Sequence, residues 1–141
     1  MISEDVLKQA LVKLVSATAI YLPQDVKDAL KKAYNEEENP VAKNVIKSIL
    51  DNIEIAESEK KPLCQDTGTV IFYVEAGENF PLLGKLPSIL REATIEATQK
   101  TPLRPNAVDV ITGKNSGNNT GERIPWIEWE ILPDSSELEV T

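Results

Sequence analysis

The sequence contains no histidine and only one cysteine, Cys64. Without histidine, the chain cannot build a serine- or cysteine-protease dyad, a histidine zinc site or a histidine acid–base pair from its own residues. A single cysteine cannot form an internal disulfide, so the sequence predicts a protein of a reducing compartment, the cytoplasm.

Basic residues are in the minority, with 15 Lys and Arg against 23 Asp and Glu, and the formal net charge is −8. This balance disfavours nucleic acid and anionic membrane surfaces as partners. Long apolar runs are also missing, since none approaches the ~20 residues needed to cross a bilayer. With 141 residues, of which 41% are hydrophobic and 27% charged, the chain is expected to be a soluble domain with its own core.

Residues 1–60 have the pattern of three amphipathic helices joined by short loops. Apolar residues recur at helical spacing over 3–21, then from Pro23 to Tyr34, and again from Pro40 to Ile53. Ser3 is a candidate N-cap, and each proline suits the first turn of a helix. These residues form the predicted helical segment.

Residues 61–141 change character and predict an α/β portion. The continuous apolar run from Thr69 to Val74 predicts a strand covered on both faces, and residues 86–98 predict a helix packed on the sheet. Polar and apolar residues alternate over 126–131, which indicates a half-buried strand with tryptophans in core and edge positions. Leu138 and Val140 suggest a further strand. The expected fold class is therefore α+β, with a small mixed sheet.

Cys64 lies in the most informative segment, Lys61-Lys-Pro-Leu-Cys-Gln-Asp-Thr-Gly-Thr69. A lone cysteine is most often a small buried hydrophobic residue. Gln65 and Asp66 are costly to bury without partners, however, and favour a thiol presented to a cavity. A metal ligand fits these neighbours, but one thiolate is too few for an iron–sulfur cluster, which needs cysteines from elsewhere. A redox thiol would lack a second cysteine to resolve it.

Two further segments are candidates for ligand binding. Arg104 stands between Pro102 and Pro105, where a stiff backbone suits bidentate capture of a carboxylate; the alternative is a loop arginine paired with an acidic side chain. The Asn- and Gly-rich segment 112–121 either forms an anion-binding nest or is a solvated turn. It is not a P-loop, because the spacing from glycine to lysine is wrong.

The three segments, in this order, resemble signature stretches of the iron–sulfur-dependent class I fumarate hydratases and the related L-tartrate dehydratases. The resemblance covers the N-terminal, or alpha, part of those enzymes and runs over all 141 residues. It rests on the Cys64 segment, on Arg104-Pro-Asn-Ala-Val108 and on Thr112-Gly-Lys-Asn-Ser-Gly-Asn-Asn-Thr-Gly-Glu-Arg-Ile-Pro125.

The resemblance implies a 4Fe–4S cluster held by three cysteines, of which Cys64 matches the first. Gln65 and Asp66 match polar residues of the substrate pocket, and Arg104 matches an arginine that binds a substrate carboxylate. From its chemistry we add the hypothesis that the Asp66 carboxyl is a catalytic group that assists proton transfer. The implied reaction is reversible hydration of fumarate to (S)-malate, or the analogous dehydration of tartrate. The implied partners are a beta part of the same enzyme, a small dicarboxylate and further copies of the chain.

The other two cysteine ligands and the expected catalytic base are not in this sequence. We therefore expect the chain to be the front portion of a longer or split enzyme, without a stable cluster or activity by itself. The competing interpretation is a non-catalytic helical interaction module. It predicts a protected Cys64 thiol and a large exposed apolar helical face, whereas the enzyme interpretation predicts an accessible thiol.

Overall fold

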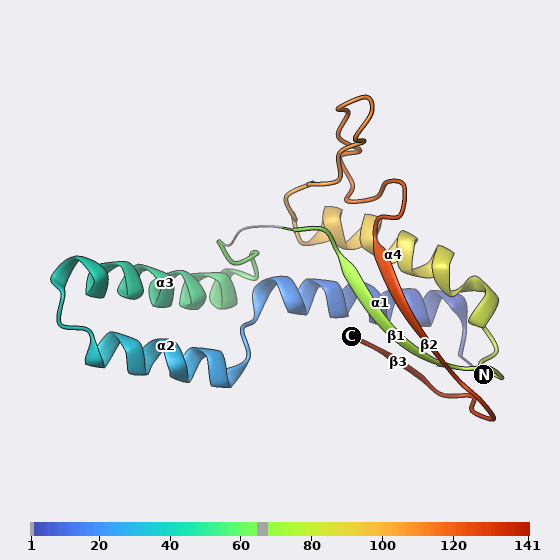
Figure 1. The fold of residues 1–141 in the computed structure, drawn as a ribbon, viewed down its shortest axis with the longest axis horizontal. Helices are drawn as coiled ribbons and strands as arrows, with labels where there is room; N and C mark the ends of the chain where they lie inside the picture. Colours follow the sequence, from blue (N-terminus) through green and yellow to red (C-terminus); the bar gives the residue numbers. More distant parts are fainter. Residues whose placement is uncertain (1, 65–67) are drawn as a thin grey trace. The chain divides into compact units, whose positions relative to one another are not determined.

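The computed structural model describes residues 2–64 and 68–141. The chain divides into two compact units, one of residues 1–15 with 66–141 and one of residues 16–65. Its elements in chain order are α1 (Glu4–Ile20), α2 (Gln24–Glu36), α3 (Pro40–Glu59), β1 (Ile71–Gly77), the short 3-10 helix η1 (Leu83–Lys85), α4 (Leu86–Lys100), β2 (Trp126–Leu132) and β3 (Leu138–Val140) (Figure 1). The predicted α+β class, with helices followed by a small mixed sheet, is confirmed.

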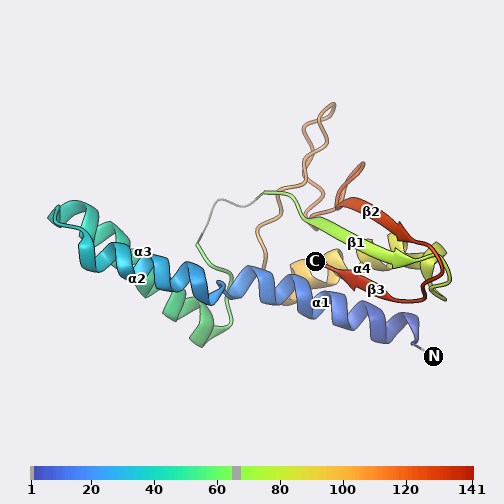
Figure 2. The ribbon, with the colours of Figure 1, turned by 60° about the horizontal axis from the view of Figure 1, so that its bottom comes forward.

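The first unit is built on a three-stranded sheet in the order β2-β1-β3. β1 runs parallel to β2, with Ile71 beside Trp126, and antiparallel to β3, with Val74 opposite Val140 (Figure 2). The strands expected from the sequence are therefore present. The central strand β1 supplies the partner for β3.

The core of this unit lies on one face of the sheet. Phe72, Val74 and Ala76 alternate along β1 and are buried against apolar side chains of α1 and α4. Ile71 and Tyr73 point to the other face and are 46% and 59% exposed, so the expectation of a strand covered on both faces is wrong. An unbroken apolar run has no period of its own and does not reveal that only alternate residues are buried.

Helix α1 begins as the sequence predicted, because the Val6 N–H donates to the Ser3 hydroxyl at 3.3 Å. By length and composition alone, the stretch Glu4–Glu36 is apolar enough to cross a membrane. It consists of two helices, α1 and α2, separated by residues 21–23, and Leu7, Leu11 and Val15 of α1 are buried in the core. A core helix of this kind passes the same test, so the stretch is weak support for a membrane span.

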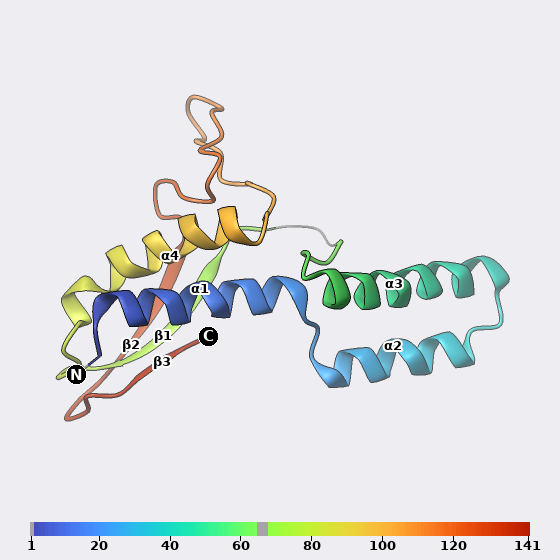
Figure 3. The same ribbon diagram turned by 180° about the vertical axis from the view of Figure 1, so that it is seen from behind.

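In the second unit, α2 and α3 form a helical hairpin (Figure 3). The side chain of Asn39 caps α3 by accepting from the N–H groups of Val41 and Ala42, which complements Pro40 in the first turn. A small core of Ile53, Ala56 and Leu63 holds the C-terminal end of α3. Val41, Val45 and Ile49 are 74%, 56% and 43% exposed, which leaves an aliphatic stripe on the N-terminal half of this helix.

Candidate functional site

Cys64 has a fixed backbone and an exposed side chain. Helix α3 ends at Glu59, and the following residue, Lys60, adopts a left-handed conformation with φ of 55° and turns the chain back. Leu63 is then buried against α3, and its N–H donates to the Ala19 carbonyl at 2.9 Å. The Cys64 N–H donates to Asn52 Oδ1 at 3.0 Å, while its thiol is free and exposed. This arrangement agrees with a presented thiol and disagrees with the protected thiol of the interaction-module interpretation.

Gln65 and Asp66, the other predicted site residues of this segment, lie outside the described residues. Among residues 2–64 and 68–141, no three His, Cys, Asp or Glu side chains come together as a metal-binding group. The exposed thiol of Cys64 and its anchored backbone are compatible with a metal ligand, but one thiolate is too few for an iron–sulfur cluster. The remaining cysteine ligands have no counterpart in this sequence.

Arg104 belongs to the first unit and is exposed. Within the part of the chain that the structure describes, its guanidinium makes no hydrogen bond and no ion pair, although 23 acidic residues are present in the sequence. Among residues 2–64 and 68–141, the alternative of a loop arginine neutralised by a carboxylate finds no support. An unpaired guanidinium with five donors can accept a carboxylate ligand.

The Asn-rich segment holds the backbone around Arg104. Asn119 Nδ2 donates to the Arg104 carbonyl at 3.2 Å, and Asn119 Oδ1 accepts from the Asn106 N–H at 2.7 Å. Asn115 Nδ2 donates to the Pro105 carbonyl at 2.9 Å. The two segments singled out from the sequence are thus brought together. Cys64 lies in the other unit, so its predicted convergence with them stays a prediction.

Residues 107–116 form a hairpin-like projection whose turn is held by one carboxylate. Val108 bridges Asn115, and Asp109 Oδ1 accepts from the Ile111 N–H, the Thr112 N–H and the Thr112 hydroxyl at 3.1, 2.6 and 2.8 Å. These bonds, those from Thr112 first, lower the pKa of Asp109. Gly113, with φ of +67°, completes the turn. Asp109 thus engages the N–H groups of Ile111, Thr112 and Gly113, which are not open to an anion.

Arg91 is a supporting residue that sequence reasoning missed. Its guanidinium donates from Nη1 to the carbonyls of Gly121 and Ile124 at 3.0 and 3.2 Å, and so ties α4 to the end of the Asn-rich segment. In the sequence Arg91 is one charged residue on a helix, and no local pattern distinguishes it from a solvated one.

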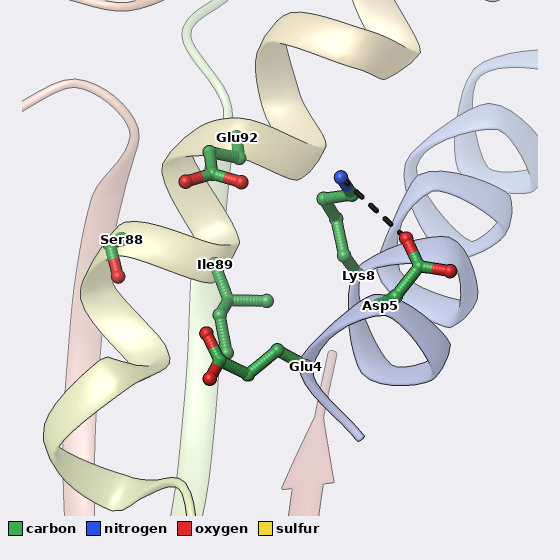
Figure 4. A pocket seen from close by; sticks show the side chains of 6 residues that line it. All are labelled: Glu4, Asp5, Lys8, Ser88, Ile89 and Glu92. Atoms are coloured by element: carbon green, nitrogen blue, oxygen red, sulfur yellow. Dashed lines mark ion pairs between the residues drawn. The ribbon is translucent and has the colours of Figure 1, made fainter. Parts of the chain in front are cut away.

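A surface pocket between the starts of α1 and α4 contains none of the predicted site residues. It is lined by Glu4, Asp5, Lys8, Ser88, Ile89 and Glu92 (Figure 4). Lys8 Nζ lies 3.8 Å from an Asp5 carboxylate oxygen, and the other polar side chains are acidic or neutral. With three carboxylates and one ammonium, this pocket is unsuited to a dicarboxylate.

Comparison with known proteins agrees with the sequence segments. The family model described as "Fumarate hydratase (Fumerase)" matches residues 8–141. The chain belongs to the fumarate hydratase (Fumerase) family. Among its relatives, the L(+)-tartrate dehydratase subunit alpha of Escherichia coli (strain K12) is 41% identical over 147 aligned positions, covering 99% of this chain and 48% of that protein. The subunit of the same name from Shigella boydii serotype 4 (strain Sb227) gives the same identity and coverage.

A relative from an archaeon has the same name, preceded by the word "Putative". The "Putative L(+)-tartrate dehydratase subunit alpha" of Methanocaldococcus jannaschii is 40% identical over 127 aligned positions, which cover 89% of this chain and 45% of that protein. The chain thus spans about half the length of the curated relatives it matches. The family and the relatives are named for adding water to, or removing it from, a dicarboxylate, so the family is one of hydro-lyases.

Proposed function

We propose that this chain is part of the alpha component of a 4Fe–4S-dependent hydro-lyase that acts on a small dicarboxylate. The observation that carries the proposal is the presentation of Cys64, whose backbone is anchored by Asn52 while its thiol is exposed. The match of the fumarate hydratase family model over residues 8–141 supports reading this thiol as part of a hydro-lyase. The relatives' designation "subunit alpha" supports a beta component as the partner.

The proposed reaction is the reversible hydration of fumarate to (S)-malate. In the dehydration direction, a proton leaves one carbon and hydroxide leaves its neighbour, and the electron pair of the C–H bond forms the new C=C bond. L-Tartrate is the second candidate substrate, because the relatives reported above are named as subunits of L(+)-tartrate dehydratase.

Cys64 would hold the cluster together with cysteines that this chain does not supply. When bound, the cluster supplies an open iron that acts as a Lewis acid on a substrate oxygen.

Arg104 would bind one substrate carboxylate, because its exposed guanidinium has no partner among the described residues. Fixing one end of the dianion restricts the geometry of the carbon that loses its proton, which lowers the entropic part of the barrier. Gln65 and Asp66 are proposed to line the same pocket, with Asp66 assisting proton transfer. An Asp66→Asn variant with undiminished turnover would remove that last role.

The test is a substrate comparison on the complete assembly that contains this chain. We expect Cys64→Ser to abolish turnover and Arg104→Lys to raise KM about tenfold or more, since loss of the planar fork removes a charge-assisted hydrogen bond. Lys13→Arg, a charge-preserving substitution at an exposed position of α1, which carries none of the predicted site residues, is expected to leave KM nearly unchanged. Turnover of L-tartrate in preference to fumarate would select the second substrate. Full activity of Cys64→Ser would exclude the proposal.

The aliphatic stripe on α3 gives the interaction-module interpretation some support. Val41, Val45 and Ile49 form the exposed apolar face which that interpretation expects. The two interpretations are compatible, because an alpha component also needs surfaces for its partners. The exposed thiol nevertheless favours the enzyme interpretation over a purely structural module.

A further inference from the structure

We propose that Asn119 is a positioning residue for Arg104. Its carboxamide fixes the backbone on both sides of Pro105, so that the Arg104 guanidinium is presented to the anionic ligand from a rigid base. The inference rests on the proposed function, because it requires that Arg104 bind a substrate carboxylate.

Among the described residues, the Asn119 side chain makes three hydrogen bonds, two to the backbone beside Pro105 and one to Thr98. Oδ1 accepts from the Asn106 N–H at 2.7 Å, and Nδ2 donates to the Arg104 carbonyl and to Thr98 Oγ1, each at 3.2 Å. Pro105 has no N–H, so the Arg104 carbonyl and the Asn106 N–H are the polar groups on either side of it. The Asn119 side chain therefore forms a hydrogen bond with each of these two backbone groups.

The clamp is anchored in the core of the first unit. Asn119 and Thr98 are each 6% exposed, and Thr98 lies on α4 among residues that pack against the sheet. The Thr98 hydroxyl donates to the Thr94 carbonyl at 2.7 Å while it accepts from Asn119. A continuous chain of hydrogen bonds thus runs from the buried face of α4 through Asn119 to the backbone of Arg104.

The backbone conformation explains why asparagine stands at this position. Asn119 has φ of 59°, in the left-handed region that asparagine and glycine tolerate better than other residues. Asparagine also combines a donor and an acceptor, as the clamp requires. Aspartate would keep the size and the acceptor but lose the two donated bonds. Glycine would keep the backbone conformation and lose the side chain alone.

The consequence for ligand binding follows from the state of Arg104. Its guanidinium is exposed and makes no hydrogen bond or ion pair among the described residues that would orient it. The position of its backbone therefore helps to set the volume that the guanidinium samples. A loose backbone would add to the entropy lost when a dicarboxylate is bound, and would weaken binding.

The experiment follows the full 141-residue chain by NMR in the wild type, Asn119→Gly and Asn119→Asp. Asn118→Ala is the matched control, because Asn118 is the neighbouring residue and its side chain bonds to Thr120 rather than to residues 104–106. Hydrogen exchange of the Asn106 amide reports the clamp. A titration with fumarate or L-tartrate reports binding. It is followed at the Arg104 Nε–H resonance and, so that Arg104→Lys proteins can also be measured, at the backbone amides of Leu103 and Asn106.

We expect Asn119→Gly to speed exchange of the Asn106 amide about tenfold or more and to weaken dicarboxylate binding by a similar factor. Asn119→Asp should weaken binding with a smaller effect on that amide, and Asn118→Ala should change neither. Unchanged Asn106 exchange in Asn119→Gly, or unchanged binding beside faster exchange, would overturn the inference.

A double-mutant cycle separates positioning from a general loss of structure. In an Arg104→Lys background, the additional loss from Asn119→Gly is expected to be smaller than in the wild type, because the fork that the clamp orients is already absent. Equal losses in both backgrounds would overturn the positioning role. If neither ligand shifts the Arg104 resonance in the wild type, the proposed role of Arg104 fails and the positioning role fails with it, while Asn106 exchange still shows whether the clamp exists.

Discussion

At the scale of single residues, side-chain amides hold the backbone at a helix start and in irregular segments, including those of Cys64 and Arg104. Asn39 caps α3, Asn52 holds the Cys64 backbone, and Asn115 and Asn119 hold the backbone from Arg104 to Asn106. Each amide can donate and accept at the same time, which suits irregular segments whose backbone groups have no helical or strand partners. The abundance of asparagine in residues 115–119 is therefore explained by loop construction.

Asp109 gives a prediction about pH. Its pKa is lowered by hydrogen bonds to the ionised carboxylate, first from Thr112 and then from Ile111. A lowered pKa in the folded state means that the carboxylate stabilises the turn above the ordinary Asp pKa, and that this contribution disappears as the pH falls through the lowered value. We expect hydrogen exchange at the Ile111 and Thr112 amides, corrected for intrinsic rates, to become relatively faster over that acid range.

Asp109→Asn is the matched variant for this test. Its neutral amide keeps an acceptor but loses the titration, so the acid-dependent change in protection at Ile111 and Thr112 should vanish. The same pH dependence in wild type and variant would show that another group controls the turn.

At the scale of elements, the strands of the sheet could largely be predicted from the sequence, but the face of β1 that is buried could not. The alternation of Trp126, Glu128 and Glu130 with apolar residues predicted β2, and in the structure these residues pair with Ile71, Tyr73 and Glu75 of β1. The error at β1 came from a run in which both faces carry apolar residues, although only one face contacts α1 and α4. Sequence period cannot reveal which face a helix covers.

Gly77 at the end of β1 gives a prediction about packing. A Cβ at this position would lie 2.4 Å from the carbonyl carbon and oxygen of Ser135 and 2.7 Å from the Ser136 nitrogen, all of them backbone atoms that cannot rotate away. We expect Gly77→Ala to destabilise the protein by about 1–3 kcal/mol, because the β2–β3 connection must move. Urea unfolding measures this difference.

Gly84→Ala is the control for that substitution. A Cβ at Gly84 would meet nothing within 4 Å, and alanine loses less backbone entropy than glycine on folding. Its stability should equal or slightly exceed that of the wild type. A Gly77→Ala protein as stable as Gly84→Ala would contradict the close approach of the two backbones.

At the scale of the whole molecule, the candidate site could be predicted only in part. The segments around Cys64, Arg104 and 112–121 were identifiable because they place polar or reactive side chains where neither a helix nor a strand period operates. Arg91 and the clamp by Asn119 depend on contacts between residues 30 and 15 positions apart, and no local pattern encodes them. Cys64 and Arg104 belong to different compact units, so the fold of either unit alone does not fix the distance between these two residues.

This division leads to a prediction about cofactor loading. Since the sequence has one cysteine and an iron–sulfur cluster needs three or four thiolates, we expect the isolated chain to retain no stable 4Fe–4S cluster after reconstitution with iron and sulfide. Its exposed thiol should instead react readily with an aromatic disulfide reagent. In the complete assembly, cluster loading should protect Cys64 from the reagent, and removal of iron by a chelator should restore the reaction. Iron and sulfide near four atoms each per isolated chain, retained through gel filtration, would contradict the prediction, and the Cys64→Ser chain provides the baseline for adventitious iron.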